Sequence, residues 1–291
     1  MPVRDMVLAA LTSVVWGLAF VATKLALDSF SAAQLTALRF LIACLPVLFV
    51  KRPPIAFPSL VLIGLTLFTG QFLLLFFAFA AGLPPGLASV SQQLQVFFTV
   101  ILAALFLRDL PTARQCVGMA VAFAGLALIA LTVGGDLRPI ALALALSAAL
   151  SWAVGNVLIK RNAAVPIFPL VVWCSLVPPL PSLLLSSLTD DRSLAAALAG
   201  ASWLSIAAAV YLGTLTTIFG YAAWGRLLQH HSASVVAPFA LLSPCTAIVA
   251  STAIFGEAFS PLRYAGMALI LAGLAIVVIP ARWMAWVHRR V

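Results

Sequence analysis

The sequence is divided into ten continuous apolar runs of about twenty residues, separated by short segments that contain polar residues, proline or glycine. About 20 apolar residues allow a helix to cross the hydrocarbon core of a bilayer, where its backbone groups can bond only to one another. Hydrophobic residues make up 64% of the chain and charged residues 8%, whereas soluble proteins have roughly half and a quarter. The runs therefore predict an all-α polytopic membrane protein, with spans that begin near Asp5, Ser31, Pro58, Leu87, Thr112, Pro139, Pro166, Ser202, Ser232 and Pro261.

Two motifs occur twice in the chain. Residues 16–24 read WGLAFVATK and residues 152–160, 136 positions later, read WAVGNVLIK. An acidic residue followed by a glycine-rich run occurs at Asp109 and again at Glu257, 148 positions later. The larger offset of the second motif indicates an insertion of about a dozen residues in the second half, most simply around residues 189–202.

The duplication predicts two repeats, residues 1–135 and residues 136–291, with five spans each. Because five is an odd number, the second repeat must enter the membrane in the opposite orientation to the first. Inverted repeats are a common construction of secondary transporters, whose binding site lies near the membrane midplane and opens to each side in turn.

The Lys and Arg residues lie mainly in alternate loops. If the N-terminus is cytoplasmic, eleven of the sixteen fall on the cytoplasmic side, four fall on the outer side, and Arg39 lies within a span. Positive loops are retained in the cytoplasm, so both termini are expected there. Topology therefore accounts for the net charge of +9, and no basic helix or aromatic-basic platform predicts nucleic-acid binding.

Cysteine and histidine do not indicate a metal site. The four cysteines lie inside apolar spans, where they are expected to be packing residues, and the three histidines lie near predicted cytoplasmic span ends. No nucleophile-base pair or pair of carboxylates is predicted on facing spans. We therefore expect no metal, no cofactor and no enzymatic activity.

The first span of each repeat carries aromatic, small and amide residues at helical spacing, namely Trp16, Gly17, Phe20, Trp152, Gly155 and Asn156. One interpretation is helix packing, in which glycine permits close approach and tryptophan fills the core. The other is that the aromatic side chains form the wall of a substrate path.

The fourth span has a polar stripe, because Gln92, Gln95 and Thr99 follow i, i+3, i+7 spacing on an otherwise apolar helix. Amide side chains need several hydrogen bonds, so this stripe either joins helices or faces a wet cavity. Further candidate binding residues on the third, eighth and ninth spans are Gln71, Tyr211, Thr214, Tyr221 and Ser243.

Arg39 lies about eight residues from the outer end of the second span, roughly 12 Å deep at 1.5 Å per residue. A charge at this depth must reach water or a polar acceptor. Two interpretations remain. Arg39 either holds backbone carbonyls and nearby loops or makes a charge contact with a substrate carboxylate.

Short signatures occur in a fixed order along the chain, namely Trp16-Gly17, Arg39-Phe40, GQF at 70–72, GLAS at 86–89, QVFFT at 95–99, GYAAWG at 220–225 and VAP at 236–238. With these signatures the two halves resemble EamA domains of the drug/metabolite transporter superfamily, and within it bacterial amino-acid and metabolite exporters. The resemblance implies an inner-membrane exporter with a central cavity formed by spans one, three, four, six, eight and nine.

None of the seven acidic residues falls at mid-membrane, where a proton-carrying carboxylate would lie. We therefore expect amino acids and related small metabolites to cross by alternating access, through facilitated diffusion or weak coupling to an ion gradient. A nucleotide-sugar or phosphosugar antiporter, which would need several basic residues in its cavity, and a drug-efflux permease are the alternatives. A monomer is compatible with this prediction.

Overall fold

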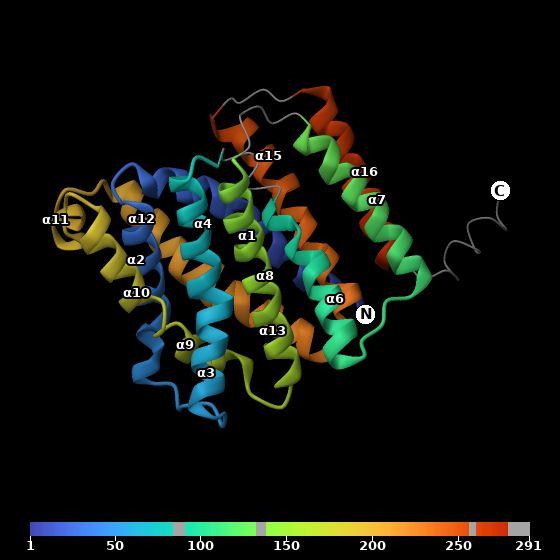
Figure 1. Cartoon of the computed structure of the whole chain (residues 1–291), viewed down its shortest axis with the longest axis horizontal. Helices are drawn as coiled ribbons and strands as arrows, with labels where there is room; N and C mark the ends of the chain where they lie inside the picture. Colours follow the sequence, from blue (N-terminus) through green and yellow to red (C-terminus); the bar gives the residue numbers. More distant parts are fainter. Residues whose placement is uncertain (84–90, 132–137, 256–259, 279–291) are drawn as a thin grey trace.

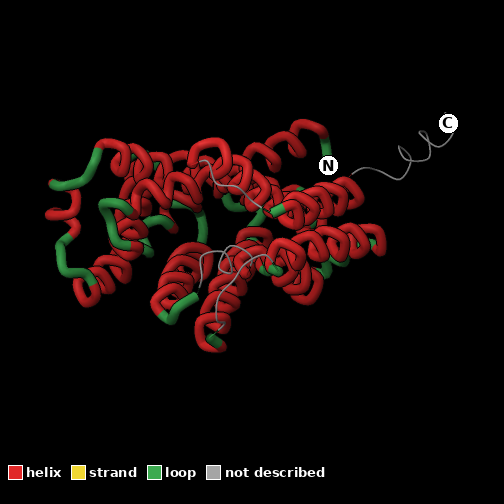
Figure 2. Tube along the Cα trace, turned by 90° about the horizontal axis from the view of Figure 1, so that it is seen from above, coloured by secondary structure: helices red, strands yellow, loops and turns green. Residues whose placement is uncertain are grey.

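A computed structural model of the chain describes residues 1–83, 91–131, 138–255 and 260–278 (Figure 1). Within these residues the regular elements are helices joined by short loops, and no strand occurs (Figure 2). The predicted span start at Leu87, the GLAS signature, the repeat boundary at residues 135–136 and Glu257 lie outside the described residues.

Helices in the first half are α1 (Val3–Leu27), α2 (Ala32–Cys44), η1 (Leu45–Leu48), α3 (Phe57–Gly64), η2 (Leu65–Gly70), α4 (Gln71–Ala80), α6 (Gln95–Leu107) and α7 (Ala113–Ala130). Helices in the second half are α8 (Pro139–Arg161), α9 (Ile167–Cys174), α10 (Pro179–Thr189), α11 (Leu194–Ala199), α12 (Trp203–Tyr211), η3 (Leu212–Phe219), α13 (Gly220–His230), α14 (Ala233–Val236), η4 (Ala237–Leu241), α15 (Leu242–Phe255) and α16 (Pro261–Val278). Among them, η1 and η4 are 3-10 helices, whereas η2 and η3 are π-helices.

Each predicted span start within the described residues lies no more than two positions from an observed helix start. Local capping explains this agreement. Ser31 and Gln34 form a reciprocal capping box at α2, and Thr112 and Gln115 form another at α7, so that otherwise unpaired N–H groups are satisfied. Pro139 begins α8, where the absent N–H removes no helical bond.

Among the described residues, seven helical segments are long and apolar enough to cross a membrane, namely Val3–Leu27, Phe57–Ala80, Ala113–Ala130, Pro139–Arg161, Ile167–Thr189, Trp203–His230 and Ala233–Ile254. Three shorter apolar helices are Ala32–Leu48, Ser91–Leu107 and Pro261–Val277. The predicted all-helical membrane fold is therefore confirmed for the described residues.

Proline interrupts the second predicted span of each half. In the first half α2 ends at Cys44 and continues as the 3-10 turn η1, which contains Pro46. In the second half α9 ends at Cys174 and α10 begins at Pro179. Proline has no N–H and clashes with the preceding turn, so neither span is a continuous α-helix.

The π-helices η2 and η3 occupy corresponding places in the third predicted span of each half. Helix η2 ends at Gly70, directly before Gln71, and η3 ends at Phe219, directly before the Gly220-Tyr221 pair. A π-turn shifts the hydrogen-bond register and is frequent at functional sites. Each π-helix also accepts a bond from the first span of the other half, since Trp16 donates to Thr216 O and Ser151 donates to Thr66 O.

Helices α7 and α16 lie side by side at one edge of the bundle (Figure 1). They meet through glycines, because a Cβ on Gly118 would lie 2.7 Å from Gly273 O, and one on Gly125 would overlap Gly266 O. The earlier glycine of α7 meets the later glycine of α16, so the two helices run antiparallel. The same glycine motif thus runs in opposite directions in the two halves.

Candidate functional site

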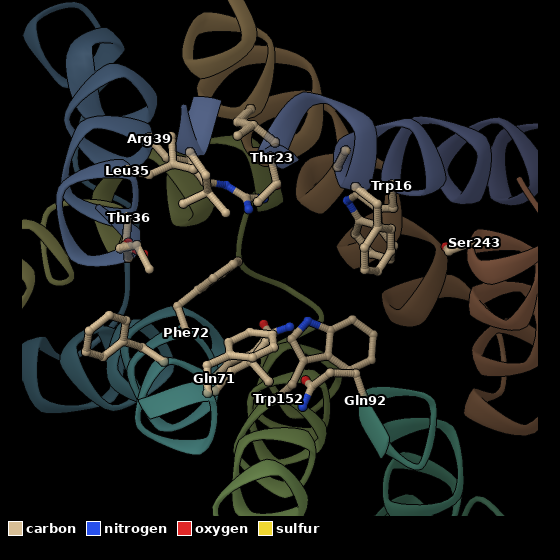
Figure 3. Close-up of a pocket in the computed structure, with 18 of the residues that line it drawn as sticks. Trp16, Thr23, Leu35, Thr36, Arg39, Gln71, Phe72, Gln92, Trp152 and Ser243 are labelled. Carbon is tan, nitrogen blue, oxygen red and sulfur yellow. The ribbon is translucent and has the colours of Figure 1, made fainter. Parts of the chain in front are cut away.

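A cavity of about 300 Å³ lies between the two halves (Figure 3), within the ~300–1,000 Å³ range of small-molecule sites. Its walls come from α1, α2, α4, residues 92–95, α8, the η3–α13 span and α15. Along α1 the lining extends from Trp16, near the middle, to Leu27, the last residue. The cavity therefore reaches the end of the bundle at which α1 finishes and α2 begins.

Four aromatic side chains form a cluster at the deep end of the cavity, near the middle of α1. We call this cluster the aromatic floor, and it consists of Trp16, Trp152, Tyr221 and Trp224. The Trp16 ring lies 6.0 Å from Trp152, 5.3 Å from Tyr221 and 5.1 Å from Trp224, measured between centroids. Trp152 and Trp224 are almost completely buried. The floor joins residues of both halves into one packed layer.

Trp16 is positioned by the π-helix opposite it. Its indole Nε1 donates to Thr216 O at 3.0 Å, a carbonyl within η3. A Cβ on Gly220 would lie 2.6 Å from the same indole nitrogen. The glycine therefore leaves the room in which Trp16 lies against the irregular backbone.

Glutamine amides form the polar wall of the cavity. The Oε1 atoms of Gln92, Gln93 and Gln95 are buried and have no hydrogen-bond partner among the described residues. Gln92 donates through its Nε2 to Ala145 O at 3.1 Å, and Gln71 accepts a bond from the Tyr221 hydroxyl at 3.2 Å. Unpaired buried amides are costly, so this wall is suited to a polar solute or water.

Arg39 lies in the wall contributed by α2, and its guanidinium points toward the cavity (Figure 3). Its side chain is buried, and Nε donates to Thr217 Oγ1 at 2.6 Å. The guanidinium carbon lies 4.6 Å from the centre of the Phe72 ring and 5.7 Å from that of Phe40. Within the described residues, Arg39 donates to no backbone carbonyl and pairs with no carboxylate.

Most of the predicted site residues lie together at this cavity, namely Trp16, Phe20, Arg39, Gln71, Gln92, Gln95, Trp152, Tyr221 and Ser243. Six do not line it, namely Gly17, Thr99, Gly155, Asn156, Tyr211 and Thr214. The structure thus brings the tryptophans, Phe20, Tyr221 and the glutamines together, whereas these six residues make other contacts.

The two glycines that do not line the cavity serve close packing, the first of the interpretations given by their sequence. A Cβ on Gly17 would lie 2.7 Å from Ser243 O, and one on Gly155 would lie 2.7 Å from the Leu67 Cβ. Glycine therefore lets α1 approach α15 and lets α8 approach η2.

The four polar residues that do not line the cavity bond to other groups within the bundle, although the buried Asn156 Oδ1 has no partner among the described residues. Asn156 donates to Thr99 Oγ1 at 3.1 Å, which joins α8 to α6. The Tyr211 hydroxyl donates to Val15 O at 2.9 Å, and Thr214 donates to Val210 O within its own span.

The cavity also contains residues that the sequence did not single out, in particular Gln93, Thr23, Thr36, Phe76 and the cation-contacting Phe72. Span two is an additional wall beside the six spans that the family resemblance implies. The sequence signal that could have predicted Gln93 was the run SQQLQ at 91–95, in which Gln93 directly follows Gln92. Leu94 N bonds to Ser91 O, a 3-10-type bond that interrupts the regular α-helical spacing at these glutamines.

The opposite end of the bundle is closed by a group that we call the ion-pair cluster: Asp5, Asp109, Lys160 and His231. Lys160 Nζ lies 3.1 Å from Asp109 Oδ2 and donates to His231 O at 2.5 Å. His231 Nε2 lies 2.7 Å from Asp5 Oδ2. Asp109 Oδ2 also accepts a bond from Ala233 N at 2.7 Å, so the cluster joins both halves.

Metal ligation has no candidate among the described residues, because no group of three His, Cys, Asp or Glu side chains comes together there. The ion-pair cluster is instead satisfied by its own bonds to backbone and side chains.

Comparisons with known proteins agree with this architecture. A model described as "EamA-like transporter family" matches residues 4–131 and 139–279. The chain is 37% identical to a "Probable amino-acid metabolite efflux pump" of Salmonella typhimurium over 94% of each chain, and 35% identical to a protein of that name in Escherichia coli over 96% of each. It is 30% identical to a "Probable terminal-alkyne amino-acid exporter" of Streptantibioticus cattleyicolor, over 92% of this chain and 91% of that protein. A crystal structure with 19% identity shares the fold, with a TM-score of 0.81 over 94% of this chain and 98% of the other.

Proposed function

Because the chain belongs to the EamA-like transporter family and is a multi-pass protein of the bacterial inner membrane, we propose that it exports amino acids and related small metabolites. Transport proceeds by alternating access through the central cavity. The observation that supports this proposal is a cavity lined by amide, hydroxyl and aromatic groups. The chain that forms it is similar along its length to proteins named as probable amino-acid efflux pumps or exporters. Such a lining suits small zwitterions, which need polar contacts as well as apolar surface.

The proposal includes ten spans in two inverted repeats, residues 1–135 and 136–291, with both termini in the cytoplasm. The seven long and three shorter apolar helices supply ten candidates. The two segments that match the family support two repeats, and the antiparallel contact between α7 and α16 supports their inversion. With the N-terminus inside, the cavity opens outward and the ion-pair cluster lies at the cytoplasmic end.

Alternating access then requires the two ends of the bundle to open in turn. The cavity reaches the outer end, whereas the aromatic floor and the ion-pair cluster separate it from the inner end. This arrangement corresponds to an outward-facing state. Export requires the floor and the cluster to separate so that a cytoplasmic solute can enter.

Movement by facilitated diffusion or weak coupling is part of the same proposal. The described residues that line the cavity include no Asp or Glu, the side chains best suited to carry a proton across. The direct test is uptake of each of the twenty amino acids into proteoliposomes that contain the purified protein. We expect uptake of a subset, with little accumulation when a pH gradient is imposed, whereas exchange of sugar phosphates or nucleotide sugars alone would contradict the proposal.

Trp16→Ala is expected to lower transport about tenfold, because the substitution removes the central ring of the aromatic floor and its apolar contact area. Trp16→Phe should retain most activity, since a ring remains and only the bond to Thr216 O is lost. Trp203→Ala is the matched control, because this tryptophan is 78% exposed at the start of α12. Initial rates in proteoliposomes, corrected for folded protein, measure the effect. Equal rates for Trp16→Ala and Trp203→Ala would exclude the floor from the transport path.

Gln95→Leu is expected to lower transport severalfold while leaving stability unchanged or slightly raised. Its Oε1 is buried without a partner among the described residues, so the substitution removes an unsatisfied polar group from the folded protein. The same substitution deprives the solute of about one hydrogen bond, which lowers transport. Gln229→Leu should give the reverse pattern, because Gln229 bonds to Val165 O and Asn162 O, away from the cavity. Thermal unfolding and initial rates for both variants provide the comparison, and a stability loss in Gln95→Leu would assign Gln95 to the scaffold.

A further inference from the structure

Arg39 is a positively charged side chain in the cavity wall, and only 8% of its surface is exposed. A buried cation is costly unless it meets an anion or enough hydrogen-bond acceptors. The described residues that line the cavity contain no second charged side chain. The charge of Arg39 therefore dominates the electrostatic character of the described cavity wall.

Neutral groups hold the guanidinium in place. Thr217 donates its hydroxyl hydrogen to Leu212 O at 2.8 Å, so its oxygen is left to accept the bond from Arg39 Nε. The bond to Leu212 spans five residues, in keeping with the π-helix η3. The ring of Phe72 lies near the guanidinium carbon, a contact that favours a cation.

These contacts leave the outer edge of the guanidinium for another ligand. Arginine has five N–H donors, and the described residues accept a hydrogen bond only from Nε. The Nη1 and Nη2 groups remain as the edge that matches both oxygens of a carboxylate. A purely structural role would use backbone carbonyls, and none of those described accepts from this side chain.

We propose that Arg39 binds the carboxylate of the transported solute, and that the cavity therefore selects molecules with a free carboxylate over their amides, esters and amines. The inference rests on the proposed function and narrows its substrate class. The carboxylate neutralises the buried charge, while the aromatic floor and the glutamine wall contact the remainder of the molecule. Arg39 then determines specificity without moving a proton.

The test compares uptake of two radiolabelled solutes into proteoliposomes, the best-transported standard amino acid and its α-carboxamide, which lacks the carboxylate. The native protein should prefer the acid about tenfold or more, as expected for a charge-assisted bidentate bond. Arg39→Gln should lower uptake of the acid about tenfold and leave uptake of the carboxamide within about twofold. Arg39→Lys should retain part of the preference, since lysine keeps the charge but not the planar pair of donors.

Arg52→Gln is the matched control, because Arg52 is exposed in the loop before α3 and bonds to Ile55 O, and it should preserve the preference. If the native protein takes up both solutes equally, or if Arg39→Gln lowers both by the same factor, the carboxylate assignment is wrong and amino-acid transport stands. If Arg39→Gln does not fold, the ratio of acid uptake to carboxamide uptake by the native protein decides whether the cavity prefers a carboxylate. If no amino acid enters at all, the proposed function fails and this inference fails with it.

Discussion

Gly125→Leu is expected to remove nearly all folded protein from the membrane. A side chain at this position would overlap Gly266 O, and its Cβ would lie 2.9 Å from Ile270 N and from the Leu269 Cβ. Two of these three contacts are backbone atoms, which cannot rotate away. Overpacking of a closely packed site costs roughly 1–3 kcal/mol or more, and here the whole α7–α16 pair must separate. Size-exclusion profiles of detergent-extracted protein, normalised to total expression, measure the loss.

Gly200→Leu is the matched control for this substitution. A Cβ on Gly200 would meet only Ala196 O at 3.8 Å, an ordinary contact at the end of α11, so this variant should elute as the native protein does. Gly125→Ala should lie between the two, because a single carbon is added at the contact. A monodisperse Gly125→Leu peak of native height would contradict the close approach of α7 to α16.

Helix starts could be predicted because the signals that set them are local. Ser31 and Thr112 cap the residues that directly follow them, and Pro139 is compatible only with a first turn. The internal repeat added a second, independent indication of the span order. Capping and repetition do not depend on the tertiary structure, so the sequence carries both in full.

Side-chain direction was harder to predict where a span is not a regular α-helix. The prediction that Tyr211, Thr214 and Tyr221 of the eighth span share the binding site assumed 3.6 residues per turn, but η3 is a π-helix. Tyr221 lies in the cavity wall, Thr217 turns to Arg39, and Thr214 bonds within its own span. A π-turn has no clear sequence signal, so only the structure shows this change of register.

Contacts between distant residues could not be derived from the sequence either. Asn156 was a candidate binding residue, yet it donates to Thr99. Lys160 was identified only as the last residue of the motif at 152–160, yet it joins the ion-pair cluster. Both partnerships depend on how helices from the two halves meet. The sequence shows which side chains need a partner, whereas the fold determines which partner they meet.

Lys160→Glu is expected to reduce transport to background. The substitution places a second carboxylate beside Asp109 and removes the donors to His231 O and Leu228 O. Like charges then replace an attraction at the end of the bundle that the proposed topology places in the cytoplasm. Like-charge repulsion at short range opposes closure of that end, and a shift of about 1.4 kcal/mol already changes the balance of states tenfold. The protein should then favour an inward-facing state and exchange its cavity with the outside only rarely.

Labelling from the outer side reports the shift directly. In a background with all four native cysteines replaced, Thr23→Cys places a thiol on the cavity wall, toward the end that the proposed topology places outside. A membrane-impermeant maleimide should modify it readily. Adding Lys160→Glu should slow that reaction about tenfold or more, in proportion to the loss of the outward-facing state.

Reversing both charges separates a gate from a general loss of folding. Asp109→Lys combined with Lys160→Glu restores opposite charges, so part of the transport and labelling should return. The return stays partial because Asp109 also accepts a bond from Ala233 N. Lys51→Glu, a charge reversal in an exposed loop, should change neither measurement. If Lys160→Glu transports and labels like Lys51→Glu, the cluster is a surface feature, and the inner end must be closed by the aromatic floor alone.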